Sequence, residues 1–284
     1  LTRVVNSFSD TRYAYDKLDR VLTDQQILGT LSFIVRSAYD KAGNRISVTY
    51  PSGKIAGYTY NALNQVTAVT VNGVALANYA FDPLNRLTTK NLLGGPAKSA
   101  VFGYDAADQL LSLENKTTAL ISKHTYLYDK AGNRLRHDNQ AGTAAVKTLN
   151  FAYNKIYELT TTTGAQAHAY AYDKVGNRTT ADSVAYASNT LNQYTTVGGV
   201  ALTYDKNGNM TGQGTRTYIY DAENRLRQVT NGTVIAGKYT YDGFNRRVSK
   251  EVGTAKTFFV HDGDMVIEER NAAGAILAAY VFGP

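Results

Sequence analysis

A short motif, Tyr-Asp-Lys-x-Gly-Asn-Arg, recurs along the chain and constrains its fold more than any other feature. Three copies match it in full, at Tyr39–Arg45, Tyr128–Arg134 and Tyr172–Arg178. A variant, Tyr204–Met210, ends in Met, and a shorter form without that Gly occurs at Tyr15–Arg20, Tyr220–Arg225 and Tyr241–Arg246. Weaker copies begin at Tyr60, Phe81, Tyr104 and Tyr153, another surrounds Asn192-Gln193 after Tyr186, and a degenerate last one is expected at His261. Copies follow one another roughly every 21 residues, and self-similarity with such a period indicates a repeat architecture.

The residues around each copy predict a β-hairpin. Tyrosines precede the turn as Tyr126-x-Tyr128 or Tyr239-x-Tyr241, and residues two apart share one face of a strand. Asp then begins a turn, because its carboxylate accepts local backbone N–H groups. Gly three residues later supplies a positive φ, and Arg with an apolar residue starts the second strand. The sequence therefore predicts an all-β fold, a long curled antiparallel sheet of tandem hairpins.

The two forms of the motif suggest two turns that differ in length by one residue. We expect the Asp and the Arg of a copy to pair across the mouth of the turn, where an exposed ion pair contributes about 0–1 kcal/mol. Because the acidic residues recur with the repeat, a turn role is favoured over a catalytic one. The expected structural anchors are Tyr15, Asp16, Tyr39, Asp40, Gly43, Asn44, Arg45, Tyr128, Asp129, Gly132, Asn133, Arg134, Tyr172, Asp173, Gly176, Asn177, Arg178, Tyr204, Asp205, Tyr220, Asp221, Arg225, Tyr241, Asp242 and Arg246.

Asn-Gly pairs between the copies predict a second set of turns. Asn72-Gly73 and Asn231-Gly232 lie between repeats, and Asn-Gly favours two-residue hairpin loops. Each repeat should therefore be joined to the next by an outer turn.

The serial Tyr-Asp-x-x-Gly-Asn-Arg copies resemble the RHS, or YD, repeat family from about Tyr13 to Pro284. The resemblance implies a β-strip that spirals into a hollow shell, as in bacterial polymorphic toxins, toxin-complex components and teneurins, which are secreted or lie on the cell surface. In such toxins the shell holds a C-terminal toxic domain, released at an aspartyl DPxGL box. Here the one Asp-Pro pair, Asp82-Pro83, continues Leu84-Asn85 inside a repeat, so cleavage site and cargo are expected outside this chain.

The length of the strip sets what this segment can build. Its hairpins supply about 25 strands spaced about 4.8 Å apart, a strip of roughly 120 Å. Sheets of more than about ten strands curl, so we expect about one turn of a spiral shell. The terminal strands should present edges that meet flanking RHS sequence or, by edge-to-edge self-association, another copy. Since the chain begins at Leu1 without a signal segment, it is expected to be an internal fragment of a longer protein. The repeats predict a single array over residues 1–284, and the resemblance implies that the longer protein is exported.

The composition offers little for chemistry. The chain has no Cys, which removes thiol catalysis, and its four His residues lack HxxH spacing, so no metal, cofactor or catalytic residue is expected. The net charge of +7 comes from scattered basic residues, which argues against specific nucleic-acid binding. No apolar stretch approaches the about 20 residues of a membrane span.

Two functions stay open. The first is a structural shell segment, not an enzyme, of an exported bacterial protein that encloses or presents a toxin-like cargo domain. The alternative is a cell-surface carbohydrate-binding or adhesion module, because exposed tyrosines can stack on sugar rings. Tyrosines packed between repeats would favour the first, and a row of them along a groove the second.

Overall fold

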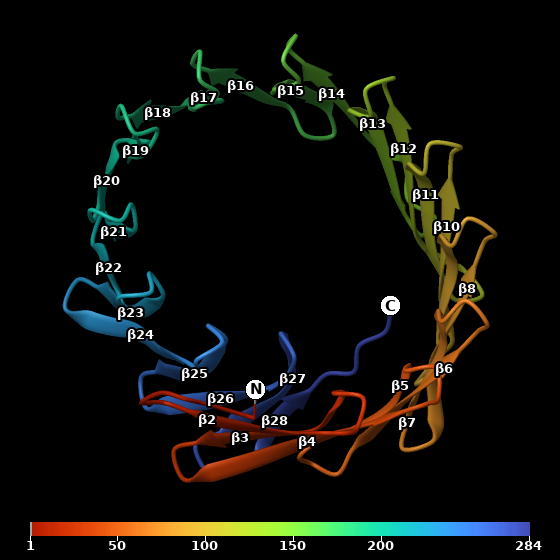
Figure 1. The fold of residues 1–284 in the computed structure, drawn as a ribbon. Helices are drawn as coiled ribbons and strands as arrows, with labels where there is room; N and C mark the ends of the chain where they lie inside the picture. The colour runs from red at the N-terminus through yellow and green to blue at the C-terminus, as the bar shows by residue number, and fades with distance from the viewer. Residues whose placement is uncertain (1) are drawn as a thin grey trace. The chain divides into compact units, whose positions relative to one another are not determined.

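The computed structural model describes residues 2–284, and all regular elements in this range are β-strands. Twenty-eight strands belong to one antiparallel sheet (Figure 1). No helix in the described range could cross a membrane. The strands are β1 (Arg3–Val5), β2 (Asp10–Tyr15), β3 (Val21–Leu28), β4 (Leu31–Tyr39), β5 (Arg45–Thr49), β6 (Ile55–Tyr60), β7 (Val66–Val71), β8 (Val74–Phe81), β9 (Leu87–Leu92), β10 (Lys98–Tyr104), β11 (Leu110–Lys116), β12 (Leu120–Tyr128), β13 (Arg134–Ala141), β14 (Lys147–Tyr153), β15 (Leu159–Gly164), β16 (His168–Tyr172), β17 (Arg178–Ala181), β18 (Val184–Ser188), β19 (Tyr194–Val197), β20 (Val200–Tyr204), β21 (Met210–Gln213), β22 (Arg216–Tyr220), β23 (Leu226–Asn231), β24 (Val234–Tyr241), β25 (Arg247–Val252), β26 (Ala255–Asp262), β27 (Met265–Asn271) and β28 (Ile276–Ala279). The predicted all-β hairpin fold is confirmed.

One five-residue turn closes the repeat hairpins of both motif forms. In the long form the N–H of Asp40 donates to the carbonyl of Asn44, and in the short form the N–H of Asp16 donates to that of Arg20. The positive φ falls three residues after the Asp in both, at Gly43 with φ 92° and at Asp19 with φ 58°. The prediction of two turn lengths is therefore wrong, because Asn or Asp takes the left-handed position that Gly fills elsewhere. Counted from the Asp, the Arg of the short form is the fourth residue, as in Arg20 after Asp16, and the Arg of the long form is the fifth, as in Arg45 after Asp40.

A β-bulge accompanies each of these turns. Ala38 pairs with Ser47 and Tyr39 pairs with Arg45, so Ile46 is the extra residue of the second strand. The same shift occurs next to the tyrosine or its replacement in the other repeat hairpins, between Ala14 and Tyr15, Thr59 and Tyr60, Ala80 and Phe81, Gly103 and Tyr104, Leu127 and Tyr128, Ala152 and Tyr153, Ala171 and Tyr172, Ala187 and Ser188, Thr203 and Tyr204, Ile219 and Tyr220, Thr240 and Tyr241, and Glu269 and Arg270. Bulges increase the right-handed twist of a strand pair, so each repeat twists the strip at one position.

The outer turns lie between repeats as expected. Asn72 and Gly73 both have positive φ, the signature of a type I′ turn, and Gly232 has φ 59° in the loop that follows Asn231. The degenerate repeat expected at His261 is wrong, because Asp262 pairs with Met265 across a two-residue loop of the outer kind. The last five-residue turn is Asn271–Ala275 instead.

The chain divides into two compact units, residues 1–74 with 202–284 and residues 75–201. In the first unit β2–β4 lie against β26–β28 (Figure 1), and hydrophobic side chains from both ends of the chain form one core. This core contains Leu28, Phe33, Val35, Val48, Tyr50, Ala56, Val248, Val260 and Ile267. Edges at the terminal strands were expected, but this packing of their faces was not.

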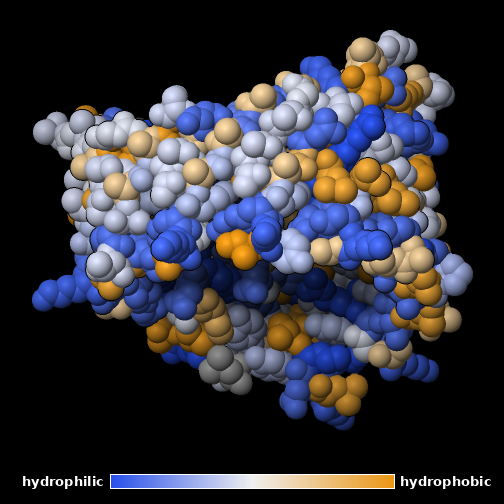
Figure 2. All heavy atoms as spheres, turned by 90° about the horizontal axis from the view of Figure 1, so that it is seen from above, coloured by the Kyte–Doolittle hydropathy of each residue, from blue (hydrophilic) through white to orange (hydrophobic). Residues whose placement is uncertain are grey.

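The second unit buries few side chains. Within residues 75–201 the buried side chains are Ala77, Tyr79 and Thr162, and the other strand residues are half-buried or exposed. Figure 2 shows hydrophobic side chains on the surface as separate patches among hydrophilic ones. Backbone pairing and contacts between neighbouring repeats therefore hold this unit together more than a core does.

Candidate functional site: the repeat lattice and the joint

The Asp of the long motif organises its own turn. One carboxylate oxygen of Asp129 accepts the N–H groups of Ala131, at 2.9 Å, and Asn133, at 2.8 Å. The other accepts the side-chain amide of Asn133 at 2.8 Å. This side-chain hydrogen bond is the main reason why the pKa of Asp129 lies below its ordinary value. Asp40, Asp173 and Asp205 have equivalent partners, so these anchors sit inside the turn.

In the short motif Arg takes the place of that Asn and reaches the next repeat. Arg20 Nε lies 2.6 Å from Asp16, while its Nη1 donates to the carbonyl of Asp40 at 3.0 Å. The same double contact joins Arg86 to Asp82 and Asp105, Arg225 to Asp221 and Asp242, and Arg246 to Asp242 and Gly263. The expected Asp–Arg pairing is therefore right for the short form.

The arginines of the long motif do not pair with their own Asp. They stand one residue later, on the strand, and point to other partners. Arg45 pairs with Asp262 at 2.7 Å, Arg134 lies 4.6 Å above the ring of Tyr126, and Arg178 lies 4.8 Å above that of Tyr170. The expected pairing is wrong for these three copies.

Seven tyrosines at the anchor position bond the hairpin that precedes their own. The hydroxyl of Tyr128 donates to the carbonyl of Leu110 at 2.9 Å, which is the first residue of the second strand in the preceding repeat. Equivalent bonds join Tyr39 to Val21, Tyr60 to Arg45, Tyr104 to Leu87, Tyr153 to Arg134, Tyr172 to Leu159 and Tyr241 to Leu226. We call this set, with the arginine contacts above, the repeat lattice. These tyrosines lie between repeats, and their hydroxyls are used within the chain.

In the first unit, polar side chains join the two ends of the chain at what we call the joint, the contact of β2–β6 with β24–β28. Gln26 is 1% exposed, and its amide donates to the carbonyl of His261 at 2.6 Å and accepts its N–H at 2.9 Å. The hydroxyl of Tyr50 donates to the carbonyl of Tyr280 at 2.7 Å. Gln26 therefore pairs with the backbone of β26 much as a neighbouring strand would.

A buried acid lies beside Gln26. Burial raises the pKa of Asp24 to about 6, against the opposing effect of Arg246, whose Nη1 is 4.0 Å from the Asp24 carboxylate. Arg246 is itself buried and bonded to Asp242 at 2.7 Å. Burial also lowers the pKa of His261. The joint thus combines an apolar core with a charge cluster that water reaches poorly.

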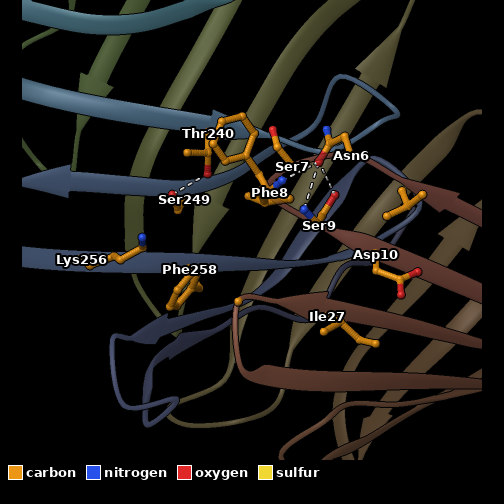
Figure 3. A pocket seen from close by; sticks show the side chains of 13 residues that line it. Asn6, Ser7, Phe8, Ser9, Asp10, Ile27, Thr240, Ser249, Lys256 and Phe258 are labelled. Atoms are coloured by element: carbon orange, nitrogen blue, oxygen red, sulfur yellow. Dashed lines mark hydrogen bonds between the residues drawn. The ribbon is translucent and has the colours of Figure 1, made fainter.

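Two cavities open at the joint. One of about 340 Å³ is drawn in Figure 3, where the side chains of Thr240 and Ser249 bond each other at 2.6 Å. Asn6, which also lines the cavity, accepts the N–H of Ser9 at 2.9 Å (Figure 3). Its side-chain amide donates to the carbonyl of Tyr241 at 2.9 Å. Asn6 therefore joins the two chain ends at this cavity, and Thr240 and Ser249 bond each other within the C-terminal strands, as structural groups do.

The second cavity, of about 470 Å³, is richer in aromatic groups. Its lining includes Tyr13, Tyr15, Tyr39, Asp24 and Asp262. Burial raises the pKa of Tyr13 to about 12. Rings beside carboxylates could take a sugar or another polar molecule with a flat apolar face.

No sequence motif singles out Asp24 or Gln26, although the anchors Asp242 and Arg246 also lie at the joint. The signal for Asp24 and Gln26 is the alternation in β3, where they and Leu28 occupy every second position and are all buried. Polar residues in register with a buried Leu indicate polar groups facing a partner. In residues 2–284 no three His, Cys, Asp or Glu side chains gather as metal ligands.

Comparison with known proteins reveals the same repeat elsewhere. Residues 118–262, just over half of the chain, match the family model for the teneurin YD-shell, and residues 39–75 match that for the RHS repeat. The tRNA3(Ser)-specific nuclease WapA of Bacillus spizizenii is 29% identical over 279 residues, covering 96% of this chain and 10% of that protein. The tRNA nuclease WapA of Bacillus subtilis strain 168 is 28% identical, with the same coverage.

Solved structures share the fold at low sequence identity. The Photorhabdus luminescens Tc holotoxin pore aligns with a TM-score of 0.74 at 15% identity, covering 97% of this chain and 17% of that chain. The TcdB2-TccC3 complex gives a TM-score of 0.71 at 14% identity, covering 95% of this chain and 18% of that one. The chain spans about a tenth of the curated relatives and under a fifth of these structures.

Proposed function

Because the chain belongs to the teneurin YD-shell family of RHS-repeat proteins, we propose that it is a wall segment of a shell that encloses or presents a partner domain. The observation that carries this proposal is the repeat lattice. The anchor tyrosines of seven copies and each short-motif arginine bond the backbone of a neighbouring hairpin, and these bonds link hairpins that lack a core of their own into a wall.

We further propose that this segment lacks catalytic activity of its own and belongs to a longer, exported protein. The relatives are named as tRNA nucleases, but the chain matches only about a tenth of their length. Its acidic anchors accept backbone N–H groups inside turns, and a substrate that displaced those groups would leave them without a hydrogen-bond partner, which costs free energy. Its partners would then be flanking RHS sequence and an enclosed toxin-like domain, at the cell surface or outside the cell.

The test compares two neighbouring positions of β12 in the longer protein. Ser122 and Lys123 are consecutive and half-buried, so their side chains lie on opposite faces of the sheet. Ser122→Cys and Lys123→Cys each introduce a thiol into a segment without Cys, and labelling uses a maleimide carrying a bulky polymer. In the isolated chain both variants should react at similar rates. In the longer protein one face should be protected, and equal labelling of both faces there would refute enclosure.

The aromatic cavity favours carbohydrate binding as a second candidate function. Three tyrosines and two carboxylates line it, the groups that stack on and hydrogen-bond a sugar. A glycan array probed with the chain and with Tyr15→Ala tests the idea. Binding that Tyr15→Ala abolishes would support it, whereas an array without signal would reject it.

A further inference from the structure

Two histidines far from the joint meet on neighbouring strands of the second unit. His124 lies in β12 and His137 in β13, and the ladder pairs His137 with Tyr126, so the two histidines are diagonal neighbours on one face. Nδ1 of His124 lies 3.1 Å from Nε2 of His137. Their rings are stacked, with centroids 5.3 Å apart and planes 24° from parallel.

The surrounding side chains hold these rings in place. Tyr126 stacks on His137 with centroids 4.9 Å apart, and the guanidinium of Arg134 covers the Tyr126 ring at 4.6 Å. Both histidines are half-buried on paired strands, so little freedom is left to lose when a ligand binds.

The distance between the two nitrogens suits a shared metal ion. Imidazole nitrogens bind Zn²⁺ at about 2.0–2.1 Å, so two of them on one ion are roughly 2.9–3.4 Å apart for angles between a right angle and a tetrahedral one. We propose that His124 and His137 form a two-imidazole site for a divalent transition-metal ion, with Cu²⁺ bound most tightly and the remaining coordination positions left to water.

Neutral imidazole rings can bind the ion without a net loss of protons. In the free protein one of the two facing nitrogens carries the proton of their hydrogen bond. When both bind metal, His124 carries its proton on Nε2 and His137 on Nδ1, so neutral rings release no proton.

The ligand set decides which metals can bind. Imidazole prefers Cu²⁺, Ni²⁺ and Zn²⁺, with Cu²⁺ first in the affinity order, whereas Ca²⁺ and Mg²⁺ require oxygen ligands. Structural zinc sites use four protein ligands, so a site with two should exchange its ion readily. Arg134 adds a nearby positive charge that weakens binding further. An ion at this site should therefore contribute little to folding.

Titration of the tag-free chain with Cu²⁺ tests the proposal, by calorimetry and by electron paramagnetic resonance. We expect one dominant site whose spectrum shows two equivalent nitrogens. His124→Gln and His137→Gln should each lose about tenfold or more in affinity, because the second ligand no longer acts on the same ion. His168→Gln is the matched control, since His168 bonds Asp182 elsewhere in the unit. Its Cu²⁺ affinity should stay within about twofold of that of the parent chain.

Unchanged affinity in His124→Gln or His137→Gln would overturn the proposal. Should either variant fold poorly, nuclear magnetic resonance of the unmodified chain decides instead. Substoichiometric Cu²⁺ should then broaden the ring signals of His124 and His137 first, and broadening confined to His168 or His261 would equally overturn it.

Discussion

Replacing Gln26 should open the joint, because this single side chain satisfies two buried backbone groups of the opposite chain end. In Gln26→Ala the N–H and the carbonyl of His261 lose partners at 2.9 and 2.6 Å. A buried polar group without a partner costs about 1–3 kcal/mol, so two of them should lower the free energy of unfolding by roughly 2–6 kcal/mol. The matched control is Gln25→Ala, whose side chain bonds Ser32 on the exposed face, with an expected loss of about 0–1 kcal/mol.

The assay has a global and a local readout. Urea unfolding followed by circular dichroism gives the loss of stability, and hydrogen exchange of the His261 amide reports the joint itself. In Gln26→Ala this amide should exchange faster, while amides of β12 and β13 in the other unit keep their protection. A loss below about 0.5 kcal/mol, with the His261 amide still protected, would refute the reasoning about buried partners.

Three further changes address the lattice, the turn and the buried acid. Tyr128→Phe removes the bond to the Leu110 carbonyl and should lower the free energy of unfolding in urea by about 0.5–1.5 kcal/mol. Tyr126→Phe, at the preceding position on the same face, should lower it less, and equal losses would contradict the lattice. Gly176→Asn should change the free energy of unfolding by no more than about 0.5 kcal/mol, because Asn fills the same turn position elsewhere. Gly176→Val should lower it by roughly 1–3 kcal/mol, because a β-branched residue is strained at φ 88°, and an unchanged free energy would contradict this. Asp24 has a pKa of about 6, above its unfolded value of 3.8, so the folded state binds more protons between these values and the contribution of Asp24 to stability falls as pH rises from about 4 to 6. The stability of Asp24→Asn relative to the parent should therefore rise by about 1–3 kcal/mol across that window in urea titrations, and a pH-independent difference would contradict the raised pKa.

Local features of the fold could be predicted from the sequence because they depend on short-range rules. The alternation at Tyr126-x-Tyr128, the turn at Asp129 and the positive φ at Gly132 all follow from neighbouring residue types. The prediction of two turn lengths was wrong because the distance from the Asp to the Arg differs between the two forms, whereas the turn is set by the distance from the Asp to the residue with positive φ, such as Asp19.

Long-range features could not be predicted in this way. Gln26 and His261 are 235 residues apart, and no local pattern says which hairpin faces which. The recurring bulge beside the anchor tyrosine has no residue signature, since Ala, Thr, Gly, Leu and Ile all precede that tyrosine. The His124–His137 contact depends on strand register, which spacing along the chain does not reveal.

The central proposal, that this chain is a shell wall, is tested most directly by a cryo-EM structure of the longer protein that contains it. We expect the hairpins of residues 2–284 to continue into flanking strands of the same kind, with density for a separate domain against one face of the sheet. A structure in which both faces of the sheet are open to solvent and no other domain lies against them would contradict the proposal that this chain is a shell wall.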